Sequence, residues 1–275
     1  MLKQRLITAA VLVPLIMLVI FKAPTEGLAI FLALIVLAAA WEWGRMLELV
    51  VTPRALFVAI IGIAMLIGFF VILPKAQLFT PMMGFATLLW LVLIVAVVSA
   101  QRSGMLKKGL SRQQYLPLGF LLFLLAWLSA VYLHQVEDNG PALLFYVMVL
   151  VAIVDAGAYF AGRQWGKHKL ANHISPGKTW QGFYGAVLVG VLVALIGAWY
   201  FDYSATQFVI FVLISMIVII FSVFGDLFES WIKRRAGVKD SGGILPGHGG
   251  ALDRIDSLLA ALPVTAFGLS FSGII

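Results

Sequence analysis

The sequence predicts an all-α, polytopic membrane protein with about nine transmembrane helices. Hydrophobic residues make up 63% of the chain and charged residues only 11%, whereas about a quarter of the residues of a soluble domain are charged. A helix needs about 20 apolar residues to cross a bilayer, so 275 residues accommodate these spans and little else. We therefore expect residues 1–275 to form a single transmembrane domain.

Long apolar runs, separated by polar segments or by Pro and Gly, define the expected spans. The first run follows "MLKQR", like the apolar core of a signal peptide, but it ends at "FKAPTEG" without a small-x-small cleavage site. It is therefore expected to remain as an uncleaved first helix. The nine expected spans are 6–22, 27–47, 55–73, 79–99, 115–133, 142–162, 182–200, 206–225 and 257–274.

The distribution of basic residues supports nine spans with a cytoplasmic N-terminus. In this arrangement all 19 Lys and Arg residues except Lys22 and Lys75 fall on the cytoplasmic side, as the positive-inside rule predicts. One span more or fewer would scatter these residues over both faces. The C-terminus is then extracytoplasmic.

Two cytoplasmic loops have a composition that topology alone does not explain. The loops after spans two and four are short and basic, but the segments of about 155–182 and 226–256 combine Gly, Pro, Ser, Asp, His and Lys. These residue types fold the backbone around anions or metal ions. The chain has no cysteine, which excludes disulfides, thiolate metal sites and a cysteine nucleophile.

The first polar segment begins inside span six. Asp155, Tyr159 and Arg163 share one helix face, with Asp155 about 12 Å further into the membrane than Arg163. A carboxylate at this depth needs a wet cavity or a partner, so Asp155 is either functional or half of a structural ion pair. Lys178 lies in "SPGKT", a turn expected to open a helix at Thr179 and to suit phosphate; topology alone is the other explanation of this lysine.

This turn is not a P-loop. The P-loop motif requires glycine five positions before its Gly-Lys pair, where this chain has Asn172, and no strand is expected before it.

The second polar segment places an acid, a hydroxyl and a base on one helix face. Asp226, Ser230 and Lys233 are spaced i, i+4, i+7, and Glu229 and Arg234 flank them. A charge run at a helix end is often only a solvated face, and we interpret Arg235 in that way. The acids that follow weaken this reading for the rest of the segment.

Asp253 and Asp256 lie one turn apart at the start of span nine, after a glycine-rich turn that can approach phosphate oxygens closely. His248 in that turn either orients a carboxylate or phosphate group or only stabilises the turn by a local hydrogen bond. Clustered carboxylates beside Lys and Arg are what metal-assisted phosphoryl or nucleotidyl transfer requires.

These residues resemble the phosphatidate cytidylyltransferase, or CDP-diacylglycerol synthase, family. The family's signature resembles the segment "SWIKRRAGVKDSGGILPGHGGALDRID", Ser230–Asp256, at every fixed position. The segments "LKQRLITAAVLVP", "DAGAYFAGRQWG" and "SPGKTWQG" are also similar, so the resemblance covers essentially the whole chain. Two departures are Gln181, where many members have Glu, and "YGA" at Tyr184–Ala186, where a Gly-Gly pair is common.

The resemblance implies Mg²⁺-dependent transfer of a cytidylyl group from CTP to phosphatidate, giving CDP-diacylglycerol and pyrophosphate for phospholipid synthesis. It implies a multi-pass protein of the bacterial cytoplasmic membrane, with its active site facing the cytoplasm, no nucleic-acid partner and a homodimer as the candidate assembly. The expected metal ligands are Asp226, Asp253 and Asp256, a second cation being a further expectation, and the expected catalytic residues are these three with Lys233 and Asp155. The expected substrate- and phosphate-binding residues are Ser230, Arg234, Lys239, Asp240, Arg254, Lys178, His248, Gly249 and Gly250.

Two other functions were weighed against this one. An ion-coupled transporter of an anionic or lipid substrate, with Asp155 as its proton site, predicts acids near the bilayer midplane and paired broken helices. Most cytoplasmic-side acids instead fall in loops, and no inverted repeat is visible in the sequence. A phosphotransferase of the CDP-alcohol type would carry a denser Asp-Gly-x-x-Ala-Arg pattern, which "DRIDSLLAALP" lacks.

Overall fold

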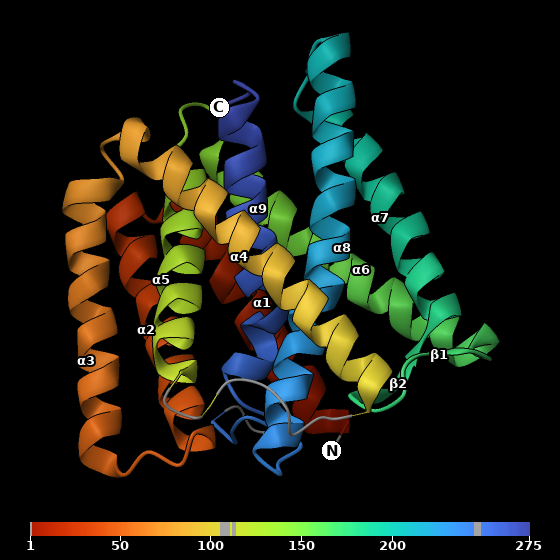
Figure 1. The fold of residues 1–275 in the computed structure, drawn as a ribbon. Coiled ribbons are helices and arrows are strands. Elements are labelled where there is room, and N and C mark those ends of the chain that lie inside the picture. Colours follow the sequence, from red (N-terminus) through yellow and green to blue (C-terminus); the bar gives the residue numbers. More distant parts are fainter. Residues whose placement is uncertain (1, 105–110, 112–113, 245–248) are drawn as a thin grey trace.

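The protein is a bundle of long helices, here described from a computed structural model for residues 2–104, 111, 114–244 and 249–275 (Figure 1). A π-helical turn, η1 (Gly68–Ile72), prolongs α3, and two short strands lie between α6 and α7. The helices found in the described ranges are α1 (Leu2–Lys22), α2 (Thr25–Met46), α3 (Val51–Ile67), α4 (Ala76–Ser103), α5 (Tyr115–His134), α6 (Gly140–Trp165), α7 (Trp180–Tyr200), α8 (Ala205–Arg235) and α9 (Leu252–Phe271).

Each of the nine predicted spans coincides with one of these helices. Among the residues described, eight helices are long and apolar enough to cross a membrane, and α1 contributes a shorter apolar stretch, Ala10–Lys22. The eighth span was predicted to end at residue 225, but α8 continues to Arg235. The ninth was predicted to begin at residue 257, but α9 begins at Leu252. Much of the second polar segment is therefore helical, which gives its side chains fixed directions.

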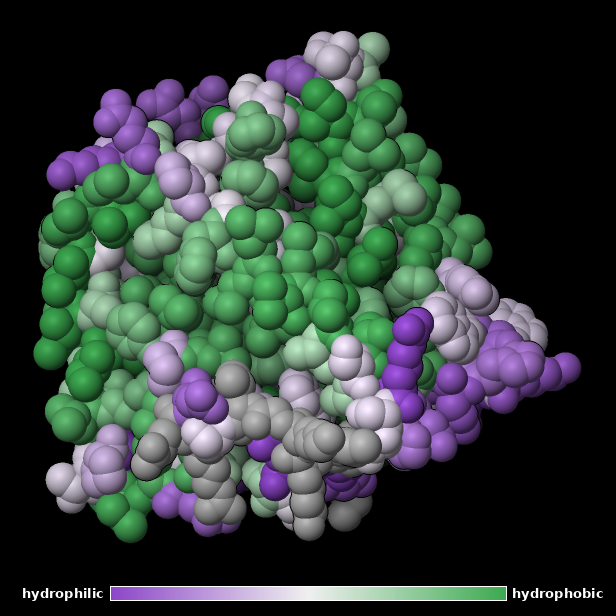
Figure 2. Space-filling model, viewed as in Figure 1, coloured by the Kyte–Doolittle hydropathy of each residue, from purple (hydrophilic) through white to green (hydrophobic). Residues whose placement is uncertain are grey.

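The outer surface matches a lipid environment. Large apolar side chains such as Ile63, Leu88, Leu192 and Val209 are more than half exposed. Figure 2 shows a broad hydrophobic band across the middle of the molecule, with hydrophilic residues gathered toward its two ends. An exposed apolar surface of this size is stable only against lipid or another apolar partner.

One part of the predicted all-α architecture needs correction. "SPGKT" is not a turn but a strand, β2 (Ser175–Thr179), which pairs antiparallel with β1 (Lys169–Ala171). The hairpin stands at the end of the bundle beside α7. The prediction of a helix start at Thr179 is confirmed, since Thr179 is the N-cap of α7 and its hydroxyl accepts a hydrogen bond from Gly182 N at 3.1 Å.

The crossing of α8 and α9 determines where the polar segments meet. Gly225 on α8 faces the first turns of α9, and a Cβ there would lie 2.8 Å from the carbonyl oxygen of Asp256. Only glycine allows the two backbones to approach so closely. The residue after Gly225 is Asp226, so the crossing brings this acid against the start of α9.

Helix α2 packs against the same region from the other side. Trp43 is buried, stacks on Phe228 of α8 with ring centroids 6.3 Å apart, and donates a hydrogen bond to the carbonyl oxygen of Tyr115 at 3.1 Å. The last turns of α2 and α8 and the first turn of α9 therefore form one packed unit.

The two ends of the chain lie at opposite ends of the bundle (Figure 1). We predict that a reporter fused after Ile275 is extracytoplasmic, and that one fused to the chain truncated after Gly104 is cytoplasmic. The basis is the odd number of spans together with the bias of Lys and Arg. Enzymatic reporters active on one side only, phosphatase outside and β-galactosidase inside, measure both positions. A cytoplasmic C-terminus would contradict the nine-span arrangement.

Candidate functional site

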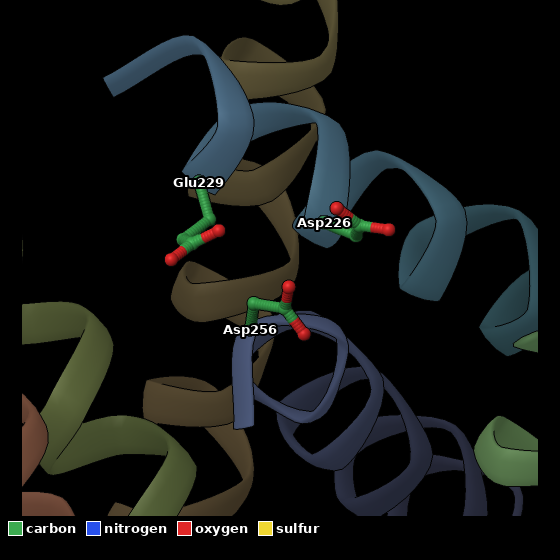
Figure 3. A group of neighbouring side chains, drawn as sticks. All are labelled: Asp226, Glu229 and Asp256. Carbon is green, nitrogen blue, oxygen red and sulfur yellow. The ribbon is translucent and has the colours of Figure 1, made fainter. Parts of the chain in front are cut away.

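Three carboxylates from two helices meet near the end of the bundle where the N-terminus lies. Asp226 and Glu229 are one turn apart on α8, and Asp256 projects toward them from α9 (Figure 3). One oxygen of each lies within 4.8 Å of the others. Three acids this close repel one another in a partly desolvated site unless cations stand beside them, and such a group can hold a divalent metal ion.

The first cation beside this group comes from the hairpin. Lys178 on β2 forms an ion pair with Asp226, Nζ to Oδ2 at 2.7 Å, and the side chains of both are only a quarter to a third exposed. Asp226 also accepts a hydrogen bond from Ser230, one turn further along α8, at 3.2 Å. The structure thus brings Lys178 of the first polar segment to the predicted acid of the second.

The second cation is Lys233, which lies between two acids. It forms ion pairs with Glu229 on its own helix and, at 2.7 Å, with Asp253 on α9. Asp253 also accepts hydrogen bonds from the backbone N–H groups of Ser241 and Gly250, at 3.0 and 2.8 Å. Backbone donors at a helix start stabilise a negative charge there. Asp253 was predicted to be a metal ligand. Its carboxylate accepts these hydrogen bonds and lies within electrostatic range of Glu229 of the three-acid group, so its role as a ligand stays a prediction.

Asp155 faces the same region from α6. It lies within electrostatic range of Asp226, Lys178 and Arg254, and its side chain is exposed although it belongs to a membrane-spanning helix. Its predicted neighbours on the helix face are confirmed in part, since Arg163 donates a hydrogen bond to the Tyr159 hydroxyl at 3.2 Å.

Most of the remaining predicted residues that the structure describes are exposed. Arg234 is exposed and donates from Nε to the carbonyl oxygen of Ile174 at 3.3 Å, which links α8 to the hairpin. Lys239, Asp240 and Arg254 are exposed. Gly249 and Gly250 form the turn before α9, and His248 lies outside the described residues.

Two acids contribute more than the sequence analysis assigned to them. Glu229 was treated only as a flanking residue, yet it is 1% exposed, and its Oε1 accepts no hydrogen bond from any residue that the structure describes. Glu42 lies outside both predicted polar segments, yet it is 2% exposed at the end of α2. The available signal was the isolated acid in the apolar run "AAAWEWG", since an ionisable residue inside a span is costly to bury.

Comparison with known proteins covers nearly the whole chain. The model of the cytidylyltransferase family matches residues 3–272. A phosphatidate cytidylyltransferase of Pseudomonas aeruginosa is 38% identical, covering 97% of this chain and 96% of the relative. One of Haemophilus influenzae is 34% identical, covering 97% and 98%, and one of Staphylococcus epidermidis is 38% identical over 56% and 60%. The predicted resemblance is confirmed: the chain belongs to the cytidylyltransferase family.

Proposed function

We propose that this protein transfers the cytidylyl group of CTP to phosphatidate, forming CDP-diacylglycerol and pyrophosphate. The observation that carries the proposal is the three-acid group with Lys178 and Lys233 beside it, in a chain similar over nearly its full length to phosphatidate cytidylyltransferases. Carboxylates and cations in this arrangement suit a reaction among phosphate groups.

The reaction needs no nucleophile from the protein. A phosphate oxygen of phosphatidate forms a bond to the α-phosphorus of CTP, and the bond from that phosphorus to the oxygen bridging to the β-phosphate breaks. Pyrophosphate leaves with the electron pair of the broken bond. The absence of cysteine from the chain is therefore no obstacle, and the task of the protein is to position two anionic substrates and to stabilise their charge.

The three-acid group fits Mg²⁺. This ion prefers oxygen ligands and is typically held by few carboxylates together with substrate phosphates. Asp226, Glu229 and Asp256 would hold it, and the buried Oε1 of Glu229, which lacks a hydrogen-bond donor among the described residues, supports a cation as its partner. When bound, Mg²⁺ supplies positive charge against the phosphate oxygens and the leaving pyrophosphate.

The neighbouring bases suit the phosphate groups. Lys178 pairs with Asp226 and Lys233 with Glu229, and the exposed Arg254 and Arg234 would bind the phosphates of a soluble triphosphate. Ser230 donates to Asp226 and orients it. Asp253 pairs with Lys233 and fixes its position. Asp155, on the membrane-spanning α6 and within electrostatic range of Asp226, would lie toward the lipid substrate.

The reaction would take place at the cytoplasmic face of the bacterial inner membrane. The N-terminal end of the bundle, where the acids lie, carries most of the Lys and Arg residues, and CTP is a cytoplasmic compound. We treat residues 1–275 as one transmembrane catalytic unit. The second cation and the homodimer stay predictions.

The decisive test is turnover by the purified protein in detergent with Mg²⁺, phosphatidate and labelled CTP or ATP. We expect labelled CDP-diacylglycerol and pyrophosphate with CTP.

In Asp253→Asn, turnover should fall by about a hundredfold or more, because the buried Lys233 loses one of its two carboxylates and shifts. An Asp253→Asn rate within about threefold of the wild type would remove Asp253 from the site. No turnover with any nucleotide would contradict the proposed function and favour transport.

Removal of one acid from the three-acid group should weaken metal binding. We expect Asp226→Asn and Asp256→Asn each to reduce the affinity for Mn²⁺, used in place of Mg²⁺, by about tenfold or more, since each loses a charged ligand. Electron paramagnetic resonance of free Mn²⁺ measures this without any turnover. Asp202→Asn, at the far end of α7, is the matched control and should leave the affinity unchanged. Equal affinities in all variants would show that the three acids hold no metal.

Substitution of Asp155 should separate function from stability. Its side chain is exposed within a span, so Asp155→Asn removes a charge among other acids and leaves no buried base unpaired. We expect lower turnover with an unchanged or higher thermal midpoint in metal-free buffer. A clearly lower midpoint, with turnover that recovers in the cold, would show that Asp155 is structural.

A further inference from the structure

Glu42 is a buried carboxylate outside both polar segments, and it accepts hydrogen bonds from both ends of the loop between α8 and α9. One of its oxygens, Oε2, accepts two hydrogen bonds, from Ser241 Oγ at 3.0 Å and from Leu252 N at 2.9 Å. These two donors stand at the two ends of the loop, Ser241 shortly after α8 and Leu252 at the first residue of α9. One side chain of α2 thus closes a loop that lies about 200 positions later in the chain.

A second residue of α2 acts on the same point. Arg45, one turn after Glu42, donates from its guanidinium group to the carbonyl oxygen of Ser241. Ser241 is 0% exposed. Its hydroxyl and its carbonyl group both form hydrogen bonds with side chains of α2.

Ser241 connects Glu42 to the candidate site through its hydrogen bonds with Asp253. Its backbone N–H donates to both oxygens of Asp253, at 3.2 and 3.0 Å, and its Oγ accepts from Asp253 N at 3.3 Å. Asp253 in turn pairs with Lys233, which pairs with Glu229 of the three-acid group. A continuous series of charged and polar contacts therefore runs from Glu42 to the proposed metal ligands.

Two glycines of the loop lie in close contact with the Glu42 carboxylate. A Cβ at Gly242 would overlap Glu42 Oε1, and one at Gly250 would overlap both oxygens. Gly243, the next residue after Gly242, has open space where a Cβ would lie. Of these two adjacent glycines, only Gly242 is required by contact with Glu42.

The burial of Glu42 carries a cost that packing does not require. No Lys or Arg in the described part of the chain forms an ion pair with it, and Oε1 accepts no hydrogen bond there. An apolar residue would fill the space in α2 without this penalty. What the carboxylate adds is a pair of directed hydrogen bonds to the two ends of the loop.

We propose that Glu42 is a positioning residue for the site, which holds Ser241 and Leu252 so that Asp253 and Lys233 are set against the three-acid group. It touches no substrate, and α2 thereby becomes part of the active unit. The inference concerns the loop itself, so it is tested by a measurement that does not depend on the proposed reaction.

The cysteine-free chain allows a direct test of the loop. Ala251→Cys introduces a thiol at a residue that is 6% exposed, and Ala266→Cys introduces one deep in α9 at 0%. We expect Glu42→Ala to raise the rate of maleimide labelling at position 251 by about tenfold or more, because the loop opens locally when its acceptor is lost. Labelling at position 266 should stay slow, which distinguishes local release from unfolding.

Conservative and matched variants decide between positioning and general stability. Glu42→Gln still offers an acceptor oxygen, so it should keep labelling slow and turnover within about threefold of the wild type. Glu48→Asn, in the exposed turn that follows α2, should behave like the wild type. Gly242→Ala should label quickly and lose about tenfold or more in kcat, whereas Gly243→Ala should do neither.

The proposal fails if Glu42→Ala labels at the wild-type rate at position 251, or if Gly242→Ala and Gly243→Ala are indistinguishable. If Glu42→Ala does not fold, the two glycine variants and Glu42→Gln still decide. If no variant, including the wild type, transfers cytidylyl groups, the labelling results stand and only the proposed function fails.

Discussion

Mutual repulsion among acids in a partly desolvated site is the constraint on which the rest of this structure depends. Asp226, Glu229 and Asp256 share a small volume near one end of the bundle, with Asp155 and Asp253 close by. Water screens such charges poorly when they are enclosed by helices. Each nearby element contributes a counter-charge or a donor: β2 brings Lys178, α8 brings Lys233, and the turn before α9 brings backbone N–H groups.

The packing of the helices fixes the positions of these acids and of their counter-charges. In lipid, helices associate through close contact of small residues more than through apolar burial. Gly225 allows α8 and α9 to cross closely next to Asp226, and Trp43 and Phe228 lock α2 onto α8. The three acids therefore stand on two closely crossing helices, α8 and α9, against which α2 packs, and the charge pattern depends on apolar contacts only a turn away.

The sequence alone was sufficient to predict the helices and to name several polar residues that the structure brings together, for identifiable reasons. Apolar runs of bilayer length leave few alternatives, so all nine spans coincide with helices. The pairing of Lys178 with Asp226 and the proximity of Asp256 join residues that were assigned to one site by their types and by resemblance.

The failures occurred where three-dimensional contacts decide the outcome. The strand at Ser175–Thr179 depends on pairing with Lys169–Ala171, which local turn propensity does not reveal. The contacts of Asp253 with Lys233 and with the backbone of Ser241 depend on the fold of the loop, which residue spacing does not reveal. Glu42 was missed because its partners lie about 200 positions away, and spacing along the chain carries no information about so distant a contact.

The separation of about 200 positions also means that Glu42 is synthesised well before its hydrogen-bond partners. A ribosome that adds about 5–20 residues per second needs roughly 10–40 s to reach Ser241 after Glu42 has been made, and α2 enters the membrane in that interval. Until then Glu42 is a lone carboxylate among apolar residues, carried into the bilayer by the hydrophobicity of the helix around it. The hydrogen bonds that satisfy this carboxylate can form only when the last helix inserts. A nascent chain that stops short of α9 therefore lacks both Asp256 and the Leu252 N–H group that donates to Glu42.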